Sequence, residues 1–406
     1  MSLSYAYPLF VSICFFLLAL STLSPKYVNK YLSLMTILVI ILSLAVMSYY
    51  LQCKTETFID LTRIANEALL IKNGNFQQVL DIYALNPLSA YYIYTAVIFN
   101  NINILKFFSS ILFYGPLLFI PYIDWVRANG KAQALLISVL FIFTFNYPST
   151  LFGIRQGPAF AIGVFGVYVA CILKKRTLGL SLIIVSTLFH ISCIVLLVGY
   201  LVSAITNKKI IHTLLFITVF YSIISYSIVE VLARVNAYFA RLQYKMDSYF
   251  VFGNNFDLHS TAVNQLLAIL IALSNILIII VAKYYRLNLN PSHARYYTFY
   301  YFITAFTIGS IATSTPLRRF AFLSWIVAIP ILSNILQRYF SNNSFVATSG
   351  ALTVTVQKKD ALSSRPILLQ ICMVCVLVVI AIEAFLYYRN YYYYYISPIQ
   401  MFDIVF

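Results

Sequence analysis

Long uninterrupted runs of apolar residues recur along the whole chain, and this pattern restricts the fold more than any other feature. Crossing about 30 Å of hydrocarbon takes roughly 20 apolar residues in an α-helix. Runs near that length lie at 7–23, 31–50, 104–122, 132–150, 157–173, 178–205, 210–230, 262–282, 296–314, 320–337 and 367–387. They lack the alternation of apolar and polar residues that barrel strands show. The sequence therefore predicts one all-α, polytopic membrane domain over residues 1–406, with about 11–12 transmembrane helices, some broken or re-entrant.

The charge pattern argues against a nucleic acid as a partner. The 406 residues are 62% hydrophobic and only 9% charged, with a formal net charge of +16. Lysines and arginines fall in short clusters between apolar runs, which is how topology signals are distributed in membrane proteins. Aromatic residues gather in runs such as 296–302 and 391–395, as in the belts at membrane–water interfaces, although some could also stack on sugars. We expect a lipid bilayer as the surroundings of this chain.

The sequence predicts neither a metal site nor a cofactor. Cys372 and Cys375 form a CxxC pair, but the pair lies within an apolar run and has no second pair of ligands nearby. The 11 acidic residues are scattered, whereas a divalent cation requires clustered carboxylates. A phosphate-binding glycine loop, an HExxH motif and a nucleophile elbow are all missing from the sequence.

Basic residues in the short loops predict which loops face the cytoplasm, because cytoplasmic loops carry an excess of Lys and Arg. This criterion selects Lys26, Lys30, Arg127, Lys131, Lys174, Lys175, Arg176, Lys283, Arg286, Arg295 and the loop 338–366. The assignments agree under two conditions. The short apolar piece 88–100 must not cross the membrane, and 178–205 must cross from the cytoplasmic side and return to it through a break near His190. A single straight helix over 178–205 would instead place Lys208 and Lys209 outside and invert every later segment.

Four polar stretches are then expected on the exoplasmic side, where the chemistry should take place. They are the loop 51–87, the turn around Arg155, the loop 231–261 and the turn 313–319. The loop 51–87 carries scattered acidic residues and is expected to form short amphipathic helices at the membrane surface. These acidic residues are Glu56, Asp60, Glu67 and Asp81.

Arg155 is the only formally charged residue between Ala132 and Leu173, in the stretch FGIRQGPAFAIG. Pro158 suits the first turn of a helix that begins directly after this arginine. The arginine could cap a helix end and reach lipid headgroups with its long side chain. Placed deeper, it would cost about 2.5–3.5 kcal/mol and would need an anionic partner. A guanidinium can bind a diphosphate through two parallel hydrogen bonds, and a helix N-terminus adds backbone donors.

His190 lies in STLFHISC, within a long stretch that carries no formal charge. Such a histidine is often neutral and hydrogen-bonded to a neighbour. Ionisable groups at membrane depth are nevertheless functional by default. We therefore expect either a general base or a hydrogen-bond donor to a phosphate oxygen.

Arg318 and Arg319 follow Pro316 at the start of an apolar run. On the predicted topology they lie outside, against the positive-inside bias, which favours an anionic ligand. One of the two could join Arg155 to hold the two phosphates of a lipid diphosphate.

The loop 231–261 contains further candidates, although a solvated loop of mixed charge explains most of its residues. Asp257 or His259 could be the base that activates a sugar hydroxyl, and the sequence does not choose between them and His190. Arg241 is a further substrate-binding candidate of the same loop.

The stretch GIRQGPAFAIGVFGVYVACILKKR, followed by STLFHIS, resembles the EpsG-like branch of the Wzy-type polysaccharide polymerases. The family pattern has an Arg-Gln pair at a helix start, an apolar helix, a Lys-Lys turn and a Phe-His-x-Ser motif. The matching residues are Arg155, Gln156, Lys174, Lys175, Phe189, His190 and Ser192. The segment NPLSAYYIY at 86–94 and the Arg-Arg-Phe at 318–320 are weaker similarities. The outer loop lacks the expected aspartate–tyrosine cluster, and Asp60 is the nearest substitute.

The resemblance implies a metal-independent glycosyltransferase that polymerises undecaprenyl-diphosphate-linked repeat units into O-antigen, capsule or exopolysaccharide. The reaction would take place at the outer leaflet of the bacterial inner membrane, with a chain-length regulator and a flippase as expected partners. Arg155 and Arg319, or Arg318, would hold the leaving diphosphate, and Gln156 would orient Arg155. His190 would serve as acceptor base or diphosphate donor. The expected substrate-binding residues are Gln156, Arg318, Ser192, Asp257, His259, Arg241 and Asp60.

Two alternatives to a polymerase stay open at this point. An O-antigen ligase would use the same donor with another acceptor, and only the loop shapes would distinguish the two. A flippase of lipid-linked oligosaccharide is the alternative from another class. Transporters built from internal repeats have corresponding broken helices in both halves, and the region 155–190 has no counterpart after residue 210.

Overall fold

The computed structural model describes residues 12–14, 16–20, 26–50, 59–143, 154–234, 243, 258–284, 291–311, 313 and 315–347. This part of the chain is helical throughout apart from its turns, which confirms the predicted all-α class. The described residues group into two compact units. Unit 1 contains the residues up to Leu197 and those from Leu332, and unit 2 contains Val198–Ile331.

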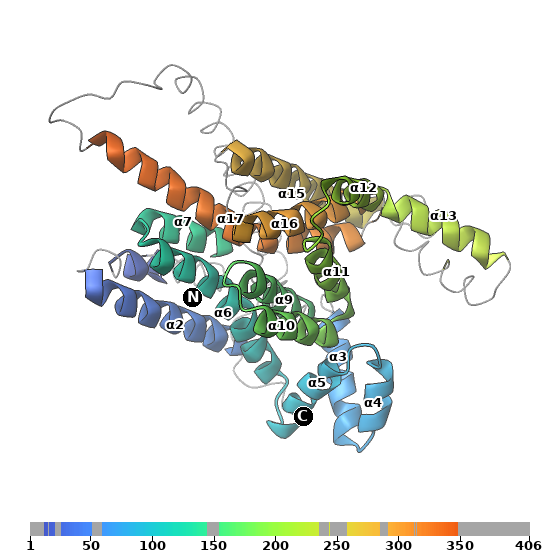
Figure 1. Ribbon diagram of the computed structural model, residues 1–406. Helices are drawn as coiled ribbons and strands as arrows, with labels where there is room; N and C mark the ends of the chain where they lie inside the picture. Colours follow the sequence, from blue (N-terminus) through green and yellow to red (C-terminus); the bar gives the residue numbers. More distant parts are fainter. Residues whose placement is uncertain are drawn as a thin grey trace. The chain divides into compact units, whose positions relative to one another are not determined.

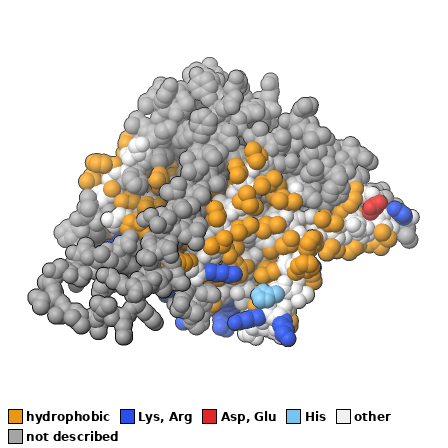
Figure 2. Space-filling view, turned by 90° about the horizontal axis from the view of Figure 1, so that it is seen from above, with side chains coloured by type: hydrophobic (Ala, Val, Ile, Leu, Met, Phe, Trp, Pro, Cys, Tyr) orange, Lys and Arg blue, Asp and Glu red, His pale blue; other side chains and the backbone are white. Residues whose placement is uncertain are grey.

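Three of the described helices are long and apolar enough to cross a membrane. The crossing segments are Lys30–Tyr50 within α2 (Lys26–Tyr50), the whole of α6 (Asn103–Ala128) and Pro316–Phe340 within α17 (Thr315–Ala347). Where Figure 2 shows described residues, apolar side chains cover much of the surface, and most of the charged side chains lie toward its lower and right-hand edges. Lipid favours such a surface, whereas water does not. The protein is therefore a polytopic membrane protein.

Unit 1 is built around α6. This helix packs against α2 on one side and against α9 (Gln156–Cys171) on another, and α9 packs against α10 (Arg176–Phe189) (Figure 1). The turn between α9 and α10 contains Lys174, whose φ is +61°. A further helix, α7 (Ala132–Phe143), follows α6 after a short turn.

The outer loop predicted at 51–87 contains helices, as expected. They are α3 (Ile59–Lys72) and α4 (Phe76–Ile82), joined through Gly74 with a φ of +87°, a value that favours glycine. The next helix, α5 (Leu88–Ile98), has 11 residues and is too short to cross a membrane, as predicted for 88–100.

The predicted break in 178–205 lies at His190. Helix α10 ends at Phe189, His190 has extended backbone angles (φ −151°, ψ 121°), and a 3-10 turn at Ile191–Cys193 leads into α11 (Ile194–Val202). The two arms are therefore separate helices rather than one straight span.

Unit 2 contains α12 (Lys208–Val219), α13 (Tyr221–Ala233), α15 (Leu258–Tyr284), α16 (Pro291–Gly309) and the first part of α17. Its core includes a buried polar network. The Asn275 amide donates to Ser324 Oγ at 2.8 Å, and Tyr300 Oη donates to Asn275 Oδ1 at 2.6 Å. This network joins α15, α16 and α17.

The candidate span 210–230 is bent in the structure, because α12 and α13 meet at an angle of 63°, as in a broken span or a re-entrant loop. The segment contains neither Gly nor Pro, so tertiary contacts explain the bend. The Tyr221 ring stacks on Phe306 of α16 at 4.2 Å, and Ser222 Oγ donates to the carbonyl oxygen of Gly309. A Cβ on Gly309 would collide with the carbonyl oxygen of Thr218 and lie 2.8 Å from Cδ1 of Tyr221, so only glycine allows α16 to end this close to the bend.

Candidate functional site

Arg155 lies in unit 1, directly before the first residue of α9. Only 9% of the residue is exposed, and its side chain does not cap the helix. The guanidinium carbon lies 4.6 Å from the centroid of the Tyr83 ring, which is a cation–π contact. A long side chain that merely reaches into the headgroup region would be exposed. The burial of Arg155 therefore favours a functional cation over a boundary marker.

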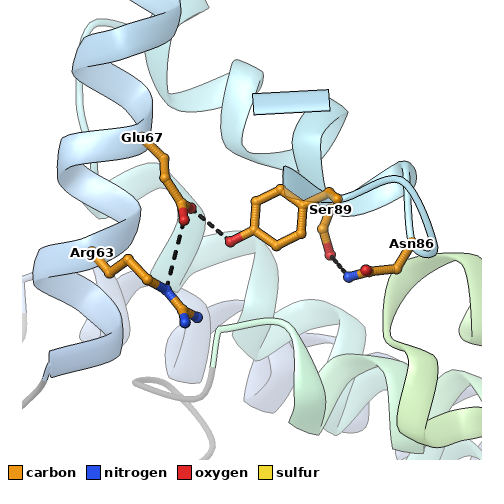
Figure 3. Close-up of polar contacts among 5 residues, drawn as sticks. Arg63, Glu67, Asn86 and Ser89 are labelled. Carbon is orange, nitrogen blue, oxygen red and sulfur yellow. Dashed lines mark hydrogen bonds and ion pairs between the residues drawn. The ribbon is translucent and has the colours of Figure 1, made fainter. Parts of the chain in front are cut away.

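Tyr83 is held in turn by a carboxylate of the outer-loop helix α3 (Figure 3). Its hydroxyl donates to Glu67 Oε2 at 2.7 Å, and Arg63 Nε lies 3.6 Å from Glu67 Oε1. Glu67 and Tyr83 are each only 5% exposed, whereas the Arg63 side chain is half-exposed. Burial raises the pKa of Tyr83, an effect that the nearby charge of Arg155 opposes. The hydroxyl thus stays protonated and keeps donating to Glu67.

His190 caps the 3-10 turn that follows it. Its Nδ1 accepts a hydrogen bond from the backbone N–H of Ser192 at 3.3 Å. A neutral imidazole that accepts at Nδ1 carries its proton on Nε2. This hydrogen bond therefore favours the tautomer of His190 that carries its proton on Nε2 and donates from there.

The break at His190 is fixed by the start of α5. Ser89 Oγ donates to the carbonyl oxygen of Phe189 at 2.6 Å, and the Asn86 amide donates to Ser89 Oγ at 3.1 Å (Figure 3). The Tyr92 ring lies 4.9 Å from the ring of Phe189. Residues of one short helix therefore fix the end of α10.

A chain of contacts through α6 joins this break to the start of α9. The hydroxyls of Tyr92 and Ser109 lie 2.7 Å apart, and Ser109 Oγ donates to the carbonyl oxygen of Ile154 at 2.8 Å. Phe189 contacts Tyr92, and Ile154 precedes Arg155. Unit 1 therefore brings the surroundings of Arg155 and His190 together at one end of its helices.

Lys106 is a second buried cation at this end of α6. It is 2% exposed and lies one helical turn before Ser109, on the same face of the helix. Lys106 was not among the predicted site residues, although it is the only charged residue in the predicted span 104–122. Tyr83 was also missed, because nothing distinguishes it from the other 33 tyrosines of the chain. Glu67 was counted only among the acidic residues of the loop.

The roles of all the predicted site residues, Arg155 and His190 included, stay predictions. Gln156 is the half-buried first residue of α9, and Ser192 takes part through its backbone. Arg318 and Arg319 are exposed residues in the first turns of α17, within unit 2, and their pairing with Arg155 of unit 1 stays a prediction. Residues outside the described part are Arg241 and Asp257, together with the side chains of Asp60 and His259.

Among the described residues, no three His, Cys, Asp or Glu side chains are grouped in a way that could hold a metal ion.

One family model, described as the EpsG family, matches residues 85–355, which is more than half of the chain. The matched range includes Arg155, His190 and Arg319, and it begins after Glu67 and Tyr83. No curated protein and no solved structure matches the chain.

Proposed function

The chain belongs to the EpsG family, and from this membership we propose that it polymerises oligosaccharide repeat units carried on undecaprenyl diphosphate. The donor is the growing chain on its lipid diphosphate, and the acceptor is a sugar hydroxyl of a new lipid-linked unit. The acceptor oxygen bonds to the anomeric carbon of the donor, and the bond from that carbon to the diphosphate oxygen breaks. The lipid diphosphate leaves with the bonding electrons, and the hydroxyl proton passes to a base.

The observation that carries this proposal is a buried guanidinium at the start of α9, close to the break at His190. A leaving diphosphate develops negative charge, and a cation fixed in a water-poor site stabilises that charge more strongly than one in water. The planar guanidinium binds two phosphate oxygens at once. Lys106, also buried at this end of unit 1, adds a second positive charge.

His190 acts on the diphosphate as a donor in this proposal. Its Nδ1 accepts from the Ser192 backbone, which leaves the proton on Nε2 for a phosphate oxygen. Asp257 and His259 then remain the candidates for the acceptor base. Arg319 or Arg318 is proposed as the further cation on the diphosphate, and Gln156 as the residue that orients Arg155. We place the reaction at the exoplasmic face of the bacterial inner membrane, without a metal.

Replacing Arg155 by lysine tests the proposal, because lysine keeps the charge and loses the planar fork. We expect R155K to lower polymer formation from purified lipid-linked repeat units by about 100-fold, the effect of removing one charge-stabilising donor group. The matched control is R176K, which changes an exposed arginine at the start of α10. Unchanged polymer yield in R155K would contradict the role of Arg155.

A deletion strain distinguishes the polymerase from the other activities. A surface lipid core that bears a single repeat unit indicates a polymerase. Free lipid-linked polymer indicates a ligase, and the loss of every surface unit indicates a flippase.

A further inference from the structure

We propose that Tyr83 and Glu67 are positioning residues that hold Arg155 in its diphosphate-binding orientation, an inference that rests on the proposed function of Arg155. Both residues come from the outer-loop region, and both lie before the range that the family model matches. They touch neither substrate nor reacting atoms in this proposal, and they act through the guanidinium.

The Tyr83 ring holds the guanidinium from one side. Its centroid lies 4.6 Å from the guanidinium carbon, and both residues are buried. Stacking uses the face of the guanidinium, whereas its N–H groups point outward in its plane. One group can therefore stack on the ring and bind phosphate oxygens with its edge.

Glu67 fixes the ring. A tyrosine ring held only by packing can tilt, but the hydroxyl of Tyr83 is tied to Glu67 Oε2 at 2.7 Å. The carboxylate is itself held by Arg63, one turn earlier on α3, with Nε 3.6 Å from Oε1. Arg63 also offsets the negative charge of Glu67, which would otherwise weaken the binding of an anion close by.

The contacts therefore form a series from the half-exposed Arg63 through Glu67 and Tyr83 to Arg155. Figure 3 shows its first part, the ion pair of Arg63 with Glu67 and the hydrogen bond that Glu67 accepts. Arg63 and Glu67 lie on α3 and Tyr83 directly follows α4, whereas Arg155 directly precedes α9. The series makes the orientation of Arg155 depend on how the outer helices are folded. A lipid-linked donor substrate that disturbs these helices would therefore alter the orientation of Arg155 without touching Arg155 itself.

Binding of undecaprenyl diphosphate to the purified full-length protein in detergent tests this inference independently of polymerisation. Its readout is the dissociation constant from the ligand-dependent rise in thermal stability. We expect Y83L to weaken binding about tenfold, the size of a desolvated cation–π contact. E67A and Y83F should weaken it less, because the ring remains. E67Q should bind nearly as the wild type does, because its amide oxygen still accepts from the tyrosine hydroxyl.

A double-mutant cycle separates positioning from a general packing defect. If Tyr83 acts through Arg155, Y83L should weaken binding far less in an R155M background, which has no cation to contact the ring, than in the wild type. Equal effects in the two backgrounds would overturn the inference.

The matched control is Y91L, which removes an exposed tyrosine of α5 whose ring lies 5.5 Å from Phe76 of α4. It disturbs the packing of the outer helices and leaves the Arg155 contact in place. A loss of binding in Y91L equal to that in Y83L would also overturn the inference. If Y83L does not fold, E67A compared with E67Q decides the question. Weak binding of the wild type, or full binding by R155K, would instead count against the proposed function.

Discussion

At the scale of single residues, His190 offers the clearest choice between two chemical roles. Its Nδ1 accepts from the Ser192 backbone, so only Nε2 is left to act on a substrate. Glutamine places an amide donor near the position of Nε2, whereas asparagine places its amide oxygen near Nδ1. We expect H190Q to keep activity within about tenfold of the wild type, and H190N to lose about 100-fold, the cost of removing a charge-stabilising donor. The measurement is kcat/KM for polymer formation.

A general base gives a different result for the same pair of variants. Neither amide accepts a proton at neutral pH, so a base role predicts that both variants lose activity to the same extent. Because asparagine preserves the cap on the turn, the thermal stability of H190N serves as the control for folding.

The residues of the candidate site differ in how readily the sequence could indicate them. Arg155 and His190 stand out as ionisable residues in apolar surroundings, where placing them costs free energy. Lys106 carries the same signal in its own apolar run. Tyr83 carries none, because tyrosine fits both an interfacial belt and a buried core. Its role follows only from the contact with Arg155, which lies more than 70 residues away in sequence.

At the scale of helices, the spacing between α9 and α10 sets the distance between Arg155 and the break at His190. Two glycines make this spacing small. A Cβ on Gly179 would lie 2.5 Å from the Cβ of Ala170 and 2.5 Å from the carbonyl oxygen of Gly166. Small residues allow such a close approach of membrane helices.

We expect G179V to lower the free energy of unfolding by about 1–3 kcal/mol, the usual cost of overpacking, and to lower polymer formation as α9 and α10 separate. The measurements are thermal denaturation in detergent and polymer yield. The matched control is S181V, which places the same side chain at an exposed position of the same helix. If S181V destabilises the protein as much as G179V does, the valine itself and not the helix contact is responsible.

The sequence predicted the helix boundaries where a local cause exists. Pro158 and its neighbouring glycine mark the start of α9, and the charge balance of the loops required a break near His190. The bend between α12 and α13 has no local cause. It depends on contacts of Tyr221 and Ser222 with α16, and no pattern within the segment reveals those partners.

At the scale of the whole molecule, residues can act on the same substrate molecule only if they lie on the same side of the membrane. The described part contains three helices long enough to cross, or four if the bent pair α12–α13 counts as one span. Several other apolar helical stretches have only 10–17 residues, among them α9, α10 and Ile191–Val202, which contains α11. Helix length alone therefore does not give the topology, and the distribution of basic residues has to supply it.

Cysteine labelling tests this topology. In a background without the six native cysteines, a membrane-impermeant maleimide should label Q78C in intact cells, because α4 belongs to the loop that is predicted to be exoplasmic. K175C, in the turn between α9 and α10, should react only after the cells are opened. The two positions are both exposed, so the difference reports sidedness and not burial.

Lys208 is the position at which the two topologies of 178–205 disagree. If α10 crosses outward and α11 returns after the break at His190, K208C lies on the cytoplasmic side and should react only in opened cells. Labelling of K208C in intact cells would mean that the segment crosses once, which inverts every later span. Arg318 and Arg319 would then lie on the cytoplasmic side, opposite to Arg155. The diphosphate would have to be held without them, and Lys106 would be the remaining buried cation at the end of unit 1 that contains Arg155.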